Sequence, residues 1–390
     1  MIFKPFFLFF YFKKKIKMNF YPGPSKVYPS VKNWLQEAYK ENILSIQHRS
    51  NTFMQMYENI VKKLQEKHNI PKEYLIIFTS SATECWHILN DTFGDNNFSK
   101  LNAYHFYNGA FGKKWFEYRK SSYPKTTFGV EFGMNEELGD KFFQQIPQND
   151  YLPNLICLCQ NETSNATQIS PTTLSEIRQN RQNDFIFIDA TSSWAGQELN
   201  FQEADVWFAS VQKCFGLPAG LGIMALSPNL IDFYQNEIKN SKNKSAVIGV
   251  STNNTHTRYN QLSFLIEKAK QFQTTYTPNV LNIYLLSKVM EYSPNISETS
   301  QKIEKRATDL YDFLETKGFK LLIENKNIRS QTVLAIELNE PKLSFLKQQA
   351  QNANIILGNG YGKWKDTTWR IANFPQHTDA EFEVLKEFLS

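Results

Sequence analysis

Two apolar stretches decide the fold of this chain: Asp-Phe-Ile-Phe-Ile-Asp-Ala at residues 184–190 and Asp-Val-Trp-Phe-Ala-Ser-Val-Gln-Lys-Cys-Phe-Gly at residues 205–216. Each contains a short run of β-branched and aromatic residues between polar ones, which predicts a buried strand. Asp189 closes the first strand, and Lys213 follows the second. The chain between them is long enough for a connection and a new strand. We therefore expect both side chains at the C-terminal edge of one sheet, where open α/β folds bind ligands.

A carboxylate and a lysine placed in this way are the two groups that pyridoxal phosphate chemistry needs. A lysine amine holds the cofactor aldehyde as a Schiff base, and a carboxylate keeps the pyridine nitrogen protonated so that the ring accepts electrons. Taken alone, the pair is equally consistent with Asp189 as a turn cap and Lys213 as a solvated surface lysine. The other loops must decide between these interpretations.

The composition is that of an ordinary globular chain. It has 390 residues, of which 41% are hydrophobic and 21% charged, enough for one large and one smaller domain. The formal net charge is +5, and the segment before Met18 holds five lysines and no acid, so the rest of the chain is neutral. This distribution gives no support for a nucleic-acid-binding surface.

The first 17 residues are interpreted separately. Their apolar run at residues 5–12 is too short to span a bilayer, and its lysines follow the run, where a signal peptide has its charge first. We expect residues 1–17 to be a disordered extension or a start-site artefact, with Met18 as the natural start; a membrane anchor is the competing interpretation. The four cysteines show neither disulfide-scaffold density nor zinc-type spacing, which favours the cytoplasm.

Strands and helices alternate from about residue 31 to residue 273, which predicts an α/β fold with a mostly parallel sheet covered on both faces. Thr277-Pro278-Asn279 then marks a break before a smaller α+β unit. We predict a large domain at 18–275 and a small domain at 276–390, with residues 18–30 packing on the small one. The strands of the large domain are expected at residues 75–78, 103–106, 155–158, 186–188, 206–209 and 221–225.

Loop residues after these strands suit a cofactor, although each also has a simpler explanation. The turn at residues 80–83 is rich in Ser and Thr and opens a helix, so it could bind phosphate or be a plain N-cap. Phe111 lies in a loop between small residues and could stack on a ring or be a core aromatic. Thr163 could donate to a phenolic oxygen or be an ordinary strand-end threonine. Gln212 could reach phosphate or be solvated.

Seven short segments, in order, carry a resemblance to a known family. They lie at residues 19–24, 45–50, 80–83, 161–163, 188–190, 212–221 and 370–373. With these segments the chain resembles the class V pyridoxal-phosphate-dependent aminotransferases from Met18 to its end, most nearly the phosphoserine aminotransferase branch. The resemblance implies fold type I: a large domain with a mostly parallel sheet of the seven-stranded type and a smaller α+β C-terminal domain. It also implies a homodimer with shared active sites and small-molecule amino-acid and 2-oxo-acid substrates, with no membrane or nucleic-acid partner.

The resemblance assigns roles to individual residues. Lys213 would hold the cofactor and move the proton at the substrate Cα, and Asp189 would pair with the pyridine nitrogen. Arg370 would grip the substrate α-carboxylate as a bidentate fork. Phe111 would stack on the cofactor ring, and Thr163 would contact its phenolic oxygen. The phosphate would be held by Ala82, Thr83 and Gln212 of the same chain and by Thr277 of the partner subunit. At the far end of the substrate the resemblance places His48 and Arg49, reaching over from the other subunit.

Three positions depart from the family pattern. The family stacks tryptophan where this chain has Phe111, and it commonly has asparagine where this chain has Tyr276. Many members carry a His-Arg pair where this chain reads Lys363-Trp364-Lys365. Lys363 or Lys365 could still meet a substrate phosphate as a point charge. The resemblance implies that glutamate and 3-phosphohydroxypyruvate give 2-oxoglutarate and O-phosphoserine. Because the fork of the His-Arg pair is missing, an alanine/serine–glyoxylate type of class V aminotransferase is the alternative.

Overall fold

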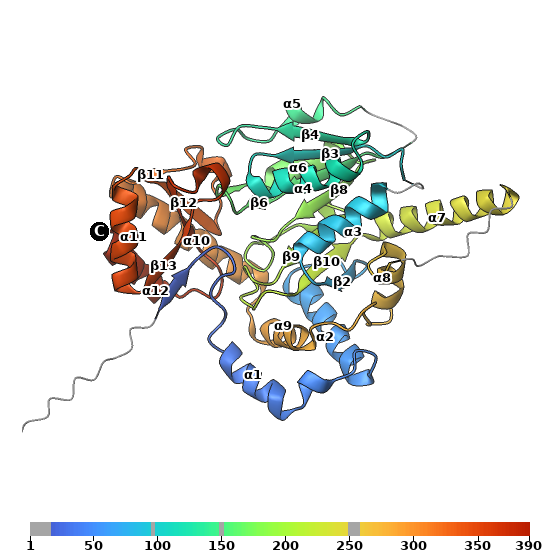
Figure 1. The fold of residues 1–390 in the computed structure, drawn as a ribbon, viewed down its shortest axis with the longest axis horizontal. Coiled ribbons are helices and arrows are strands. Elements are labelled where there is room, and N and C mark those ends of the chain that lie inside the picture. The colour runs from blue at the N-terminus through green and yellow to red at the C-terminus, as the bar shows by residue number, and fades with distance from the viewer. Residues whose placement is uncertain (1–16, 95–97, 148–151, 249–257) are drawn as a thin grey trace, which may run out of the picture.

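The structure is a computed structural model that describes residues 17–94, 98–147, 152–248 and 258–390. The expectation of a disordered extension or start-site artefact therefore falls, except for Lys17, outside the described residues. The chain forms two main sheets that lie side by side, with helices around each (Figure 1).

The larger sheet has seven strands in the order β2-β10-β9-β8-β5-β3-β4. Only β10 runs antiparallel to its neighbours, so β2 and the other five strands end at the same edge. The predicted α/β fold with a mostly parallel sheet is thereby confirmed. The strands are β2 (Leu75–Thr79), β3 (Ala103–Tyr107), β4 (Thr127–Glu131), β5 (Leu155–Cys159), β8 (Phe185–Asp189), β9 (Val206–Ser210) and β10 (Gly222–Leu226).

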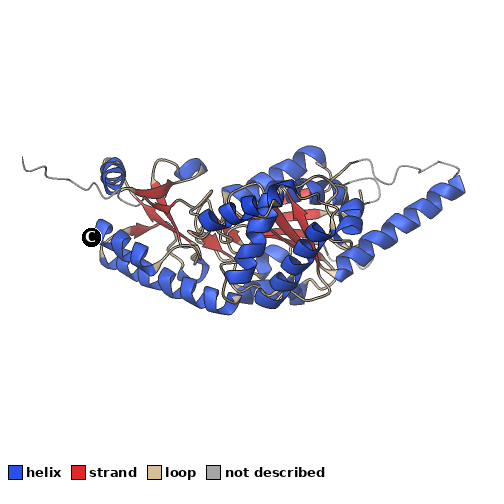
Figure 2. Cartoon of the chain, turned by 90° about the horizontal axis from the view of Figure 1, so that it is seen from below, coloured by secondary structure: helices blue, strands red, loops and turns tan. Residues whose placement is uncertain are grey.

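Helices cover both faces of this sheet (Figure 2), which explains why inner strands such as β8, β9 and β10 are buried along their whole length. In β9, Trp207 and Ala209 belong to one core cluster, whereas Val206 and Phe208 belong to the other. The first cluster includes side chains of α2 (Asn51–Lys67), α6 (Pro171–Asn180) and α9 (Val280–Tyr292). The second includes side chains of α3 (Ala82–Gly94), α4 (Ala110–Ser122), α7 (Pro228–Ile248) and α8 (Leu262–Ala269).

The second sheet has the order β1-β13-β14-β12-β11. Its strand β1 comes from the start of the described chain and runs parallel to β13, with Phe20 opposite Leu357. The strands are β1 (Met18–Phe20), β11 (Lys320–Leu321), β12 (Val333–Glu337), β13 (Ile355–Asn359) and β14 (Thr368–Ala372). The helices α10 (Ile296–Thr316), α11 (Lys342–Ala353) and α12 (Asp379–Leu389) follow in the same part of the chain.

The remaining elements are short. A two-stranded ladder joins β6 (Asn161–Glu162) to β7 (Thr167–Gln168), next to the end of β5. The other helical segments are α1 (Val31–Lys40), α5 (Asp140–Phe143), η1 (Ile43–Ser45), η2 (Phe201–Glu203), η3 (Lys326–Ile328) and η4 (Gly362–Trp364). Among the described residues, no helix combines the length and apolar character that crossing a membrane would require.

The sequence prediction missed several strands, among them β4 and β14, and one residue lies in a different element from the one expected. The edge strand β4 exposes Phe128, and β14 carries Arg370 at its centre, so neither reads as a regular apolar run. Phe111, expected in a loop, lies in the first turn of α4. That helix begins at Ala110, directly after the Asn-Gly pair that ends the loop from β3.

Candidate active site

Lys213 follows β9 in a turn at the common edge of the parallel strands. Only 7% of its surface is exposed, and its Nζ donates a hydrogen bond to the Pro22 carbonyl at 2.5 Å. The same Nζ lies 5.9 Å from the centroid of the Phe111 ring. The interpretation of Lys213 as a solvated surface lysine is therefore wrong.

The surroundings of Lys213 favour its neutral amine. Burial and, to a smaller extent, the positive charge of Arg370 lower its pKa to about 8, against smaller opposing effects of Cys214, Asp189 and Glu162. A lysine with this pKa has a substantial neutral fraction near neutral pH. The neutral amine is the form that attacks a carbonyl group or accepts a proton.

Asp189 ends β8 and is buried. Its Oδ2 accepts a hydrogen bond from Trp86 Nε1 at 3.0 Å, and its Oδ1 accepts one from the Thr191 backbone N–H at 2.9 Å. Burial raises the pKa of this carboxyl to about 6. No ion pair joins Asp189 to a basic side chain within the described parts of the chain, so a protonated ring nitrogen would supply the missing positive charge.

Arg370, at the centre of β14, brings the second sheet into the site. It is 4% exposed; its Nε donates to the Asn359 carbonyl at 2.8 Å and its Nη1 to the Thr163 carbonyl at 2.7 Å. Its guanidinium carbon lies 5.8 Å from the centroid of the Tyr361 ring. Burial lowers the pKa of Arg370, and no carboxylate of the described residues forms an ion pair with it. A structural salt bridge therefore does not account for this arginine, and a carboxylate ligand would satisfy it.

Two stacked aromatic rings lie near Lys213 and Arg370, Phe111 beside the lysine and Tyr361 beside the arginine. The ring of Phe111 stacks on that of Tyr361, with centroids 5.0 Å apart and planes 27° from parallel. Glu162 fixes the start of α4 beneath it, because its Oε2 accepts hydrogen bonds from the backbone N–H groups of Phe111 and Gly112, both at 3.1 Å. Phe111 is thus held by its backbone as well as by its ring.

Thr163 and the turn at residues 80–83 occupy the same sheet edge. Thr163 is buried, and its hydroxyl shares a hydrogen bond with that of Ser192. The N–H of Ala82 at the start of α3 donates to Ser210 Oγ at 2.7 Å, which ties this helix N-terminus to the end of β9. Thr83 is exposed in the first turn of the same helix. A helix N-terminus in this position suits a phosphate group.

The remaining predicted site residues lie away from this cluster or at its edge. Gln212 is half-buried beside Lys213, and its carbonyl accepts from the Ser25 N–H at 3.1 Å. Lys363 is exposed, with its Nζ 4.8 Å from the centroid of the Trp364 ring.

Three of the predicted residues have no visible link to the site within their own chain. His48 is half-buried, whereas Arg49 and Thr277 are exposed. Within the described ranges, no hydrogen bond, ion pair or ring contact joins any of the three to Lys213, Asp189 or Arg370. The pKa of His48 is lowered by burial and by the neighbouring Arg49.

Sequence reasoning missed four contributors: Trp86, Glu162, Tyr361 and the Pro22 carbonyl. Glu162 and Pro22 stand in two of the segments that carry the family resemblance. The resemblance therefore pointed to these segments but did not predict the hydrogen bonds that the two residues make. Trp86 lies in the second turn of α3, behind the Ser/Thr turn. Nothing in the sequence pattern marks Tyr361, because its contact with Phe111 depends on how the second sheet packs against the first.

The groups gathered at this sheet edge fit pyridoxal phosphate and do not resemble a metal site. A buried lysine with a lowered pKa, a buried carboxylate without a cation, a stacking aromatic ring and a helix N-terminus meet at one sheet edge. No group of three or more His, Cys, Asp or Glu side chains within residues 17–390, the undescribed gaps excepted, could hold a metal ion.

Comparisons with known proteins agree with this geometry. A family model described as "Aminotransferase class-V" matches residues 136–362, more than half of the chain. A phosphoserine aminotransferase of Rhodococcus opacus (strain B4) is 24% identical over 364 residues, spanning 90% of this chain and 89% of the relative.

Solved structures extend the similarity to the whole fold. A phosphoserine aminotransferase from Cytophaga hutchinsonii ATCC 33406 gives a TM-score of 0.84 at 28% identity, covering 96% of this chain and 98% of that one. An alanine–glyoxylate aminotransferase from Nostoc sp. gives a TM-score of 0.75 at 16% identity, covering 96% of each chain. The fold expected from the sequence is therefore confirmed, and it is shared by enzymes with different substrates.

Proposed function

The chain belongs to the class-V aminotransferase family and is a pyridoxal-phosphate-dependent transaminase; within that family we propose that it moves the amino group of glutamate to 3-phosphohydroxypyruvate, giving 2-oxoglutarate and O-phosphoserine. The observation that carries the proposal is the buried Arg370, with which no carboxylate of the described residues forms an ion pair, next to the buried Lys213, in a chain whose relatives include phosphoserine aminotransferases. This reaction would serve serine biosynthesis.

Pyridoxal phosphate, when bound, supplies a ring that withdraws electrons from the substrate Cα. Lys213 holds the cofactor and, as a neutral amine, takes and returns the proton at Cα. Asp189 keeps a proton on the pyridine nitrogen, and Trp86 and the Thr191 N–H hold that carboxylate in place. Phe111 would support the ring, and Thr163 would donate to its phenolic oxygen. Ala82, Thr83 and Gln212 would hold the phosphate, together with Thr277 of the partner subunit.

The substrate is bound at its two ends. Arg370 grips the α-carboxylate, which orients the Cα–H bond for proton removal by Lys213. The anionic far end is met by Lys363 and by His48 and Arg49 of the partner subunit. Glutamate and 3-phosphohydroxypyruvate both carry a negative charge there, so one positively charged pocket serves both half-reactions.

The alternative, transamination of alanine, serine or glyoxylate, is favoured by one feature. The segment Lys363-Trp364-Lys365 lacks the arginine fork that would bind a phosphate with two parallel hydrogen bonds. The cofactor residues would be the same in either enzyme, so only the far end of the substrate pocket separates the two functions.

The decisive experiment is a visible-absorbance titration of the cofactor-loaded enzyme with O-phosphoserine, and then with alanine and serine. We expect O-phosphoserine to change the cofactor spectrum at the lowest concentration. A response to alanine or serine at lower concentration than to O-phosphoserine would establish the alternative. A protein that acquires no cofactor absorbance when pyridoxal phosphate is added would contradict the assignment of Lys213.

The contribution of Lys363 is tested by Lys363→Ala, with Lys365→Ala as the control from the same exposed loop. Loss of a point charge that meets the substrate phosphate should raise KM for O-phosphoserine about tenfold. KM for glutamate should change less, because a carboxylate carries less charge. Equal effects of the two substitutions would show that Lys363 has no specific contact with the phosphate.

We further propose that the enzyme is a cytoplasmic homodimer with shared active sites. The free state of all four cysteines supports a reducing compartment. The separation of His48, Arg49 and Thr277 from Lys213 within one chain supports sites completed by a second copy.

Mixing two inactive variants, Lys213→Ala and Arg49→Ala, tests this sharing. A hybrid dimer would contain one site with both native residues, so subunit exchange should restore about one quarter of the wild-type activity. Mixtures that remain inactive after verified exchange would place Arg49 in the same site as its own Lys213, or in none.

A further inference from the structure

A strap of backbone at residues 21–28 crosses the lysine turn, which we define as residues 212–216. The backbone N–H groups of Ser25 and Tyr28 donate to the first and last carbonyls of that turn, at 3.1 and 3.0 Å. The amine of Lys213 donates to a carbonyl of the same strap. Strap and turn are thus paired at both ends of the turn, and the contacts between those ends decide where the lysine amine lies.

Gln376 supplies a contact between the two ends. Its Nε2 donates to the Lys213 carbonyl at 3.1 Å and to the Lys26 carbonyl of the strap at 2.7 Å. Gln376 is 3% exposed. Because both partners are carbonyl oxygens, the amide nitrogen must face them and the amide oxygen must face away. The side chain therefore joins strap and turn in one defined orientation.

Gly216 makes room for this arrangement. Its backbone lies in the left-handed region, with φ +63°, and a Cβ there would stand 2.7 Å from the Tyr28 ring and 3.2 Å from Oε1 of Gln376. That Oε1 has no hydrogen-bond partner among the described atoms. Burying an amide with an unpaired oxygen costs free energy, so stability alone does not explain a glutamine at this position.

The loop that carries Gln376 is itself held in place by α10. Arg306 donates from Nη1 to the His377 carbonyl at 2.5 Å and from Nη2 to the Phe374 carbonyl at 3.1 Å. Its guanidinium carbon lies 5.0 Å from the centroid of the Phe382 ring. Arg306 is thus engaged in fixing the loop on both sides of Gln376, so the loop presents the amide to the lysine turn in a fixed position.

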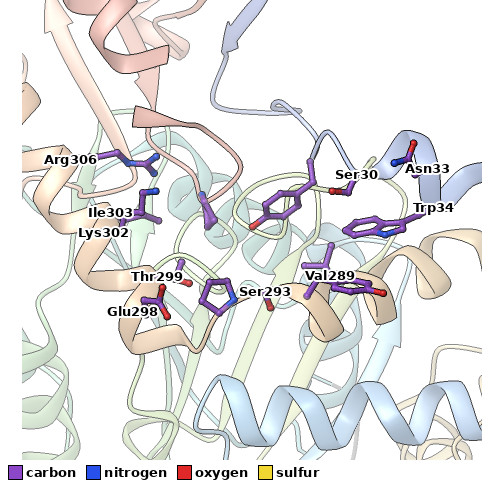
Figure 3. Close-up of a pocket in the computed structure, with 14 residues that line it drawn as sticks. Ser30, Asn33, Trp34, Val289, Ser293, Glu298, Thr299, Lys302, Ile303 and Arg306 are labelled. Carbon is purple, nitrogen blue, oxygen red and sulfur yellow. The ribbon is translucent and has the colours of Figure 1, made fainter. Parts of the chain in front are cut away.

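A cavity of about 480 Å³ borders the junction of strap and loop (Figure 3). Tyr28 of the strap and Pro375 of the loop line it, together with Trp34 of α1 and Ile303 of α10. Because side chains do not fill this space, packing supports the junction less firmly here than in the core. The hydrogen bonds of Gln376 therefore carry more of the work of fixing the lysine turn.

We propose that Gln376 is a positioning residue for Lys213: by joining the lysine turn to the strap, its amide fixes where the lysine amine lies. Gln376 follows Arg370 on one segment of the chain, so this segment would hold both the substrate carboxylate and the base. The inference rests on the proposed role of Lys213, through which Gln376 acts.

Stopped-flow uptake of pyridoxal phosphate by the cofactor-free full chain tests the proposal. Gln376→Met keeps the side-chain volume but removes both hydrogen bonds, so the displaced amine should take up the cofactor about tenfold more slowly. Gln160→Met is the matched control. Gln160 is also 3% exposed and has an unpaired Oε1, but its Nε2 donates to Ile169 and Gln197. Its rate of uptake should be close to that of the wild type.

Steady-state kinetics of the cofactor-loaded enzyme provides a second readout. Gln376→Met should lower kcat per bound cofactor about tenfold but leave KM for glutamate nearly unchanged, because proton transfer depends on the amine and carboxylate binding does not. Gln376→Asn keeps a buried amide but is one methylene too short to reach both carbonyls. It should show the same split between kcat and KM with a smaller loss of stability.

Two results would overturn the positioning role. One is an equal rate of cofactor uptake in Gln376→Met and Gln160→Met. The other is a loss of folded protein in both Gln376 variants with unchanged kcat per bound cofactor. A wild-type chain that acquires no cofactor absorbance would instead contradict the role of Lys213 itself.

Discussion

The amine of Lys213 lies between two groups that act on its charge in opposite directions, the guanidinium of Arg370 and the carboxylate of Asp189. Burial adds to the effect of Arg370, and together they bring the pKa to about 8. Arg370, which we propose binds the substrate carboxylate, would therefore also lower the pKa of Lys213, the proposed base. This dual effect could not be read from the sequence, because Arg370 is remote along the chain and approaches only through the packing of β14.

Removing the charge of Arg370 should move the titration of Lys213 upward. Because the pKa of Lys213 is about 8 with Arg370 in place, we expect the midpoint of the pH dependence of pyridoxal phosphate uptake in cofactor-free Arg370→Gln to rise above that of the wild type. The stopped-flow rate of uptake between pH 6 and pH 10 measures it. Arg258→Gln, which removes a surface arginine paired with Asp91, is the control. A midpoint that stays constant or falls would contradict the coupling.

Asp189 should make the cofactor-free protein less stable as the pH rises. Burial raises its folded pKa to about 6, above its ordinary value near 4, so between these values the unfolded chain ionises first and gains stability. The contribution of this group to the free energy of unfolding should fall by roughly 2 kcal/mol from pH 4 to pH 6. Urea unfolding of Asp189→Asn should lack this part of the pH dependence; an identical pH profile in both proteins would refute it.

The segment that leads out of β1 approaches the site as a single piece of backbone. Pro22 accepts the hydrogen bond from Lys213, and Gly23 lies so close that a Cβ there would stand 2.5 Å from Lys213 Cε and Nζ. At this scale the sequence predicted the strand ends that carry Asp189 and Lys213, because both strands are short, apolar and sharply bounded. It could not predict the contact of Pro22 and Gly23 with Lys213, because that contact depends on how closely two distant segments pack and not on a sequence pattern.

We expect Gly23→Ala to displace the Lys213 side chain and weaken pyridoxal phosphate binding at least tenfold, because backbone with positive φ and a 2.5 Å contact leave no room for a methyl group. Equilibrium titration of the cofactor-free protein measures the effect. Gly139→Ala, where nothing lies within 4 Å of the added Cβ, is the control. Unchanged affinity in Gly23→Ala would show that the lysine can adopt another path to the cofactor.

At the scale of the whole molecule, the second sheet depends on a strand from the opposite end of the described chain. Phe20 of β1 is fully buried and packs against His377 and Phe382 with ring centroids 5.2 Å away in both cases. The division of the chain at residues 275 and 276 remains a proposal. The second sheet has its own core cluster, but α9, which follows the proposed boundary, packs in the first cluster with the larger sheet. The alternation of strands and helices could predict the larger sheet, but no pattern indicated which strand borders β13.

Phe20→Ala should lower the free energy of unfolding by about 3–5 kcal/mol, since it leaves a cavity in the core of the second sheet. Tyr39→Ala, at a residue 75% exposed, should stay within about 0.5 kcal/mol of wild type. Chemical denaturation followed by near-ultraviolet circular dichroism measures both. Equal stability of the two variants would contradict the packing of β1 in this sheet.

The parallel pairing of β1 with β13 also has a consequence for synthesis on the ribosome. Residues 18–20 leave the exit tunnel early, but their partners at residues 355–357 are added only near the end of translation. The second sheet must therefore form after almost the whole chain has been made. Until then, the backbone N–H and C=O groups of residues 18–20 lack their partners in β13. Nascent chains stalled before residue 355 should accordingly hold the larger sheet while leaving this segment accessible to chaperones and proteases.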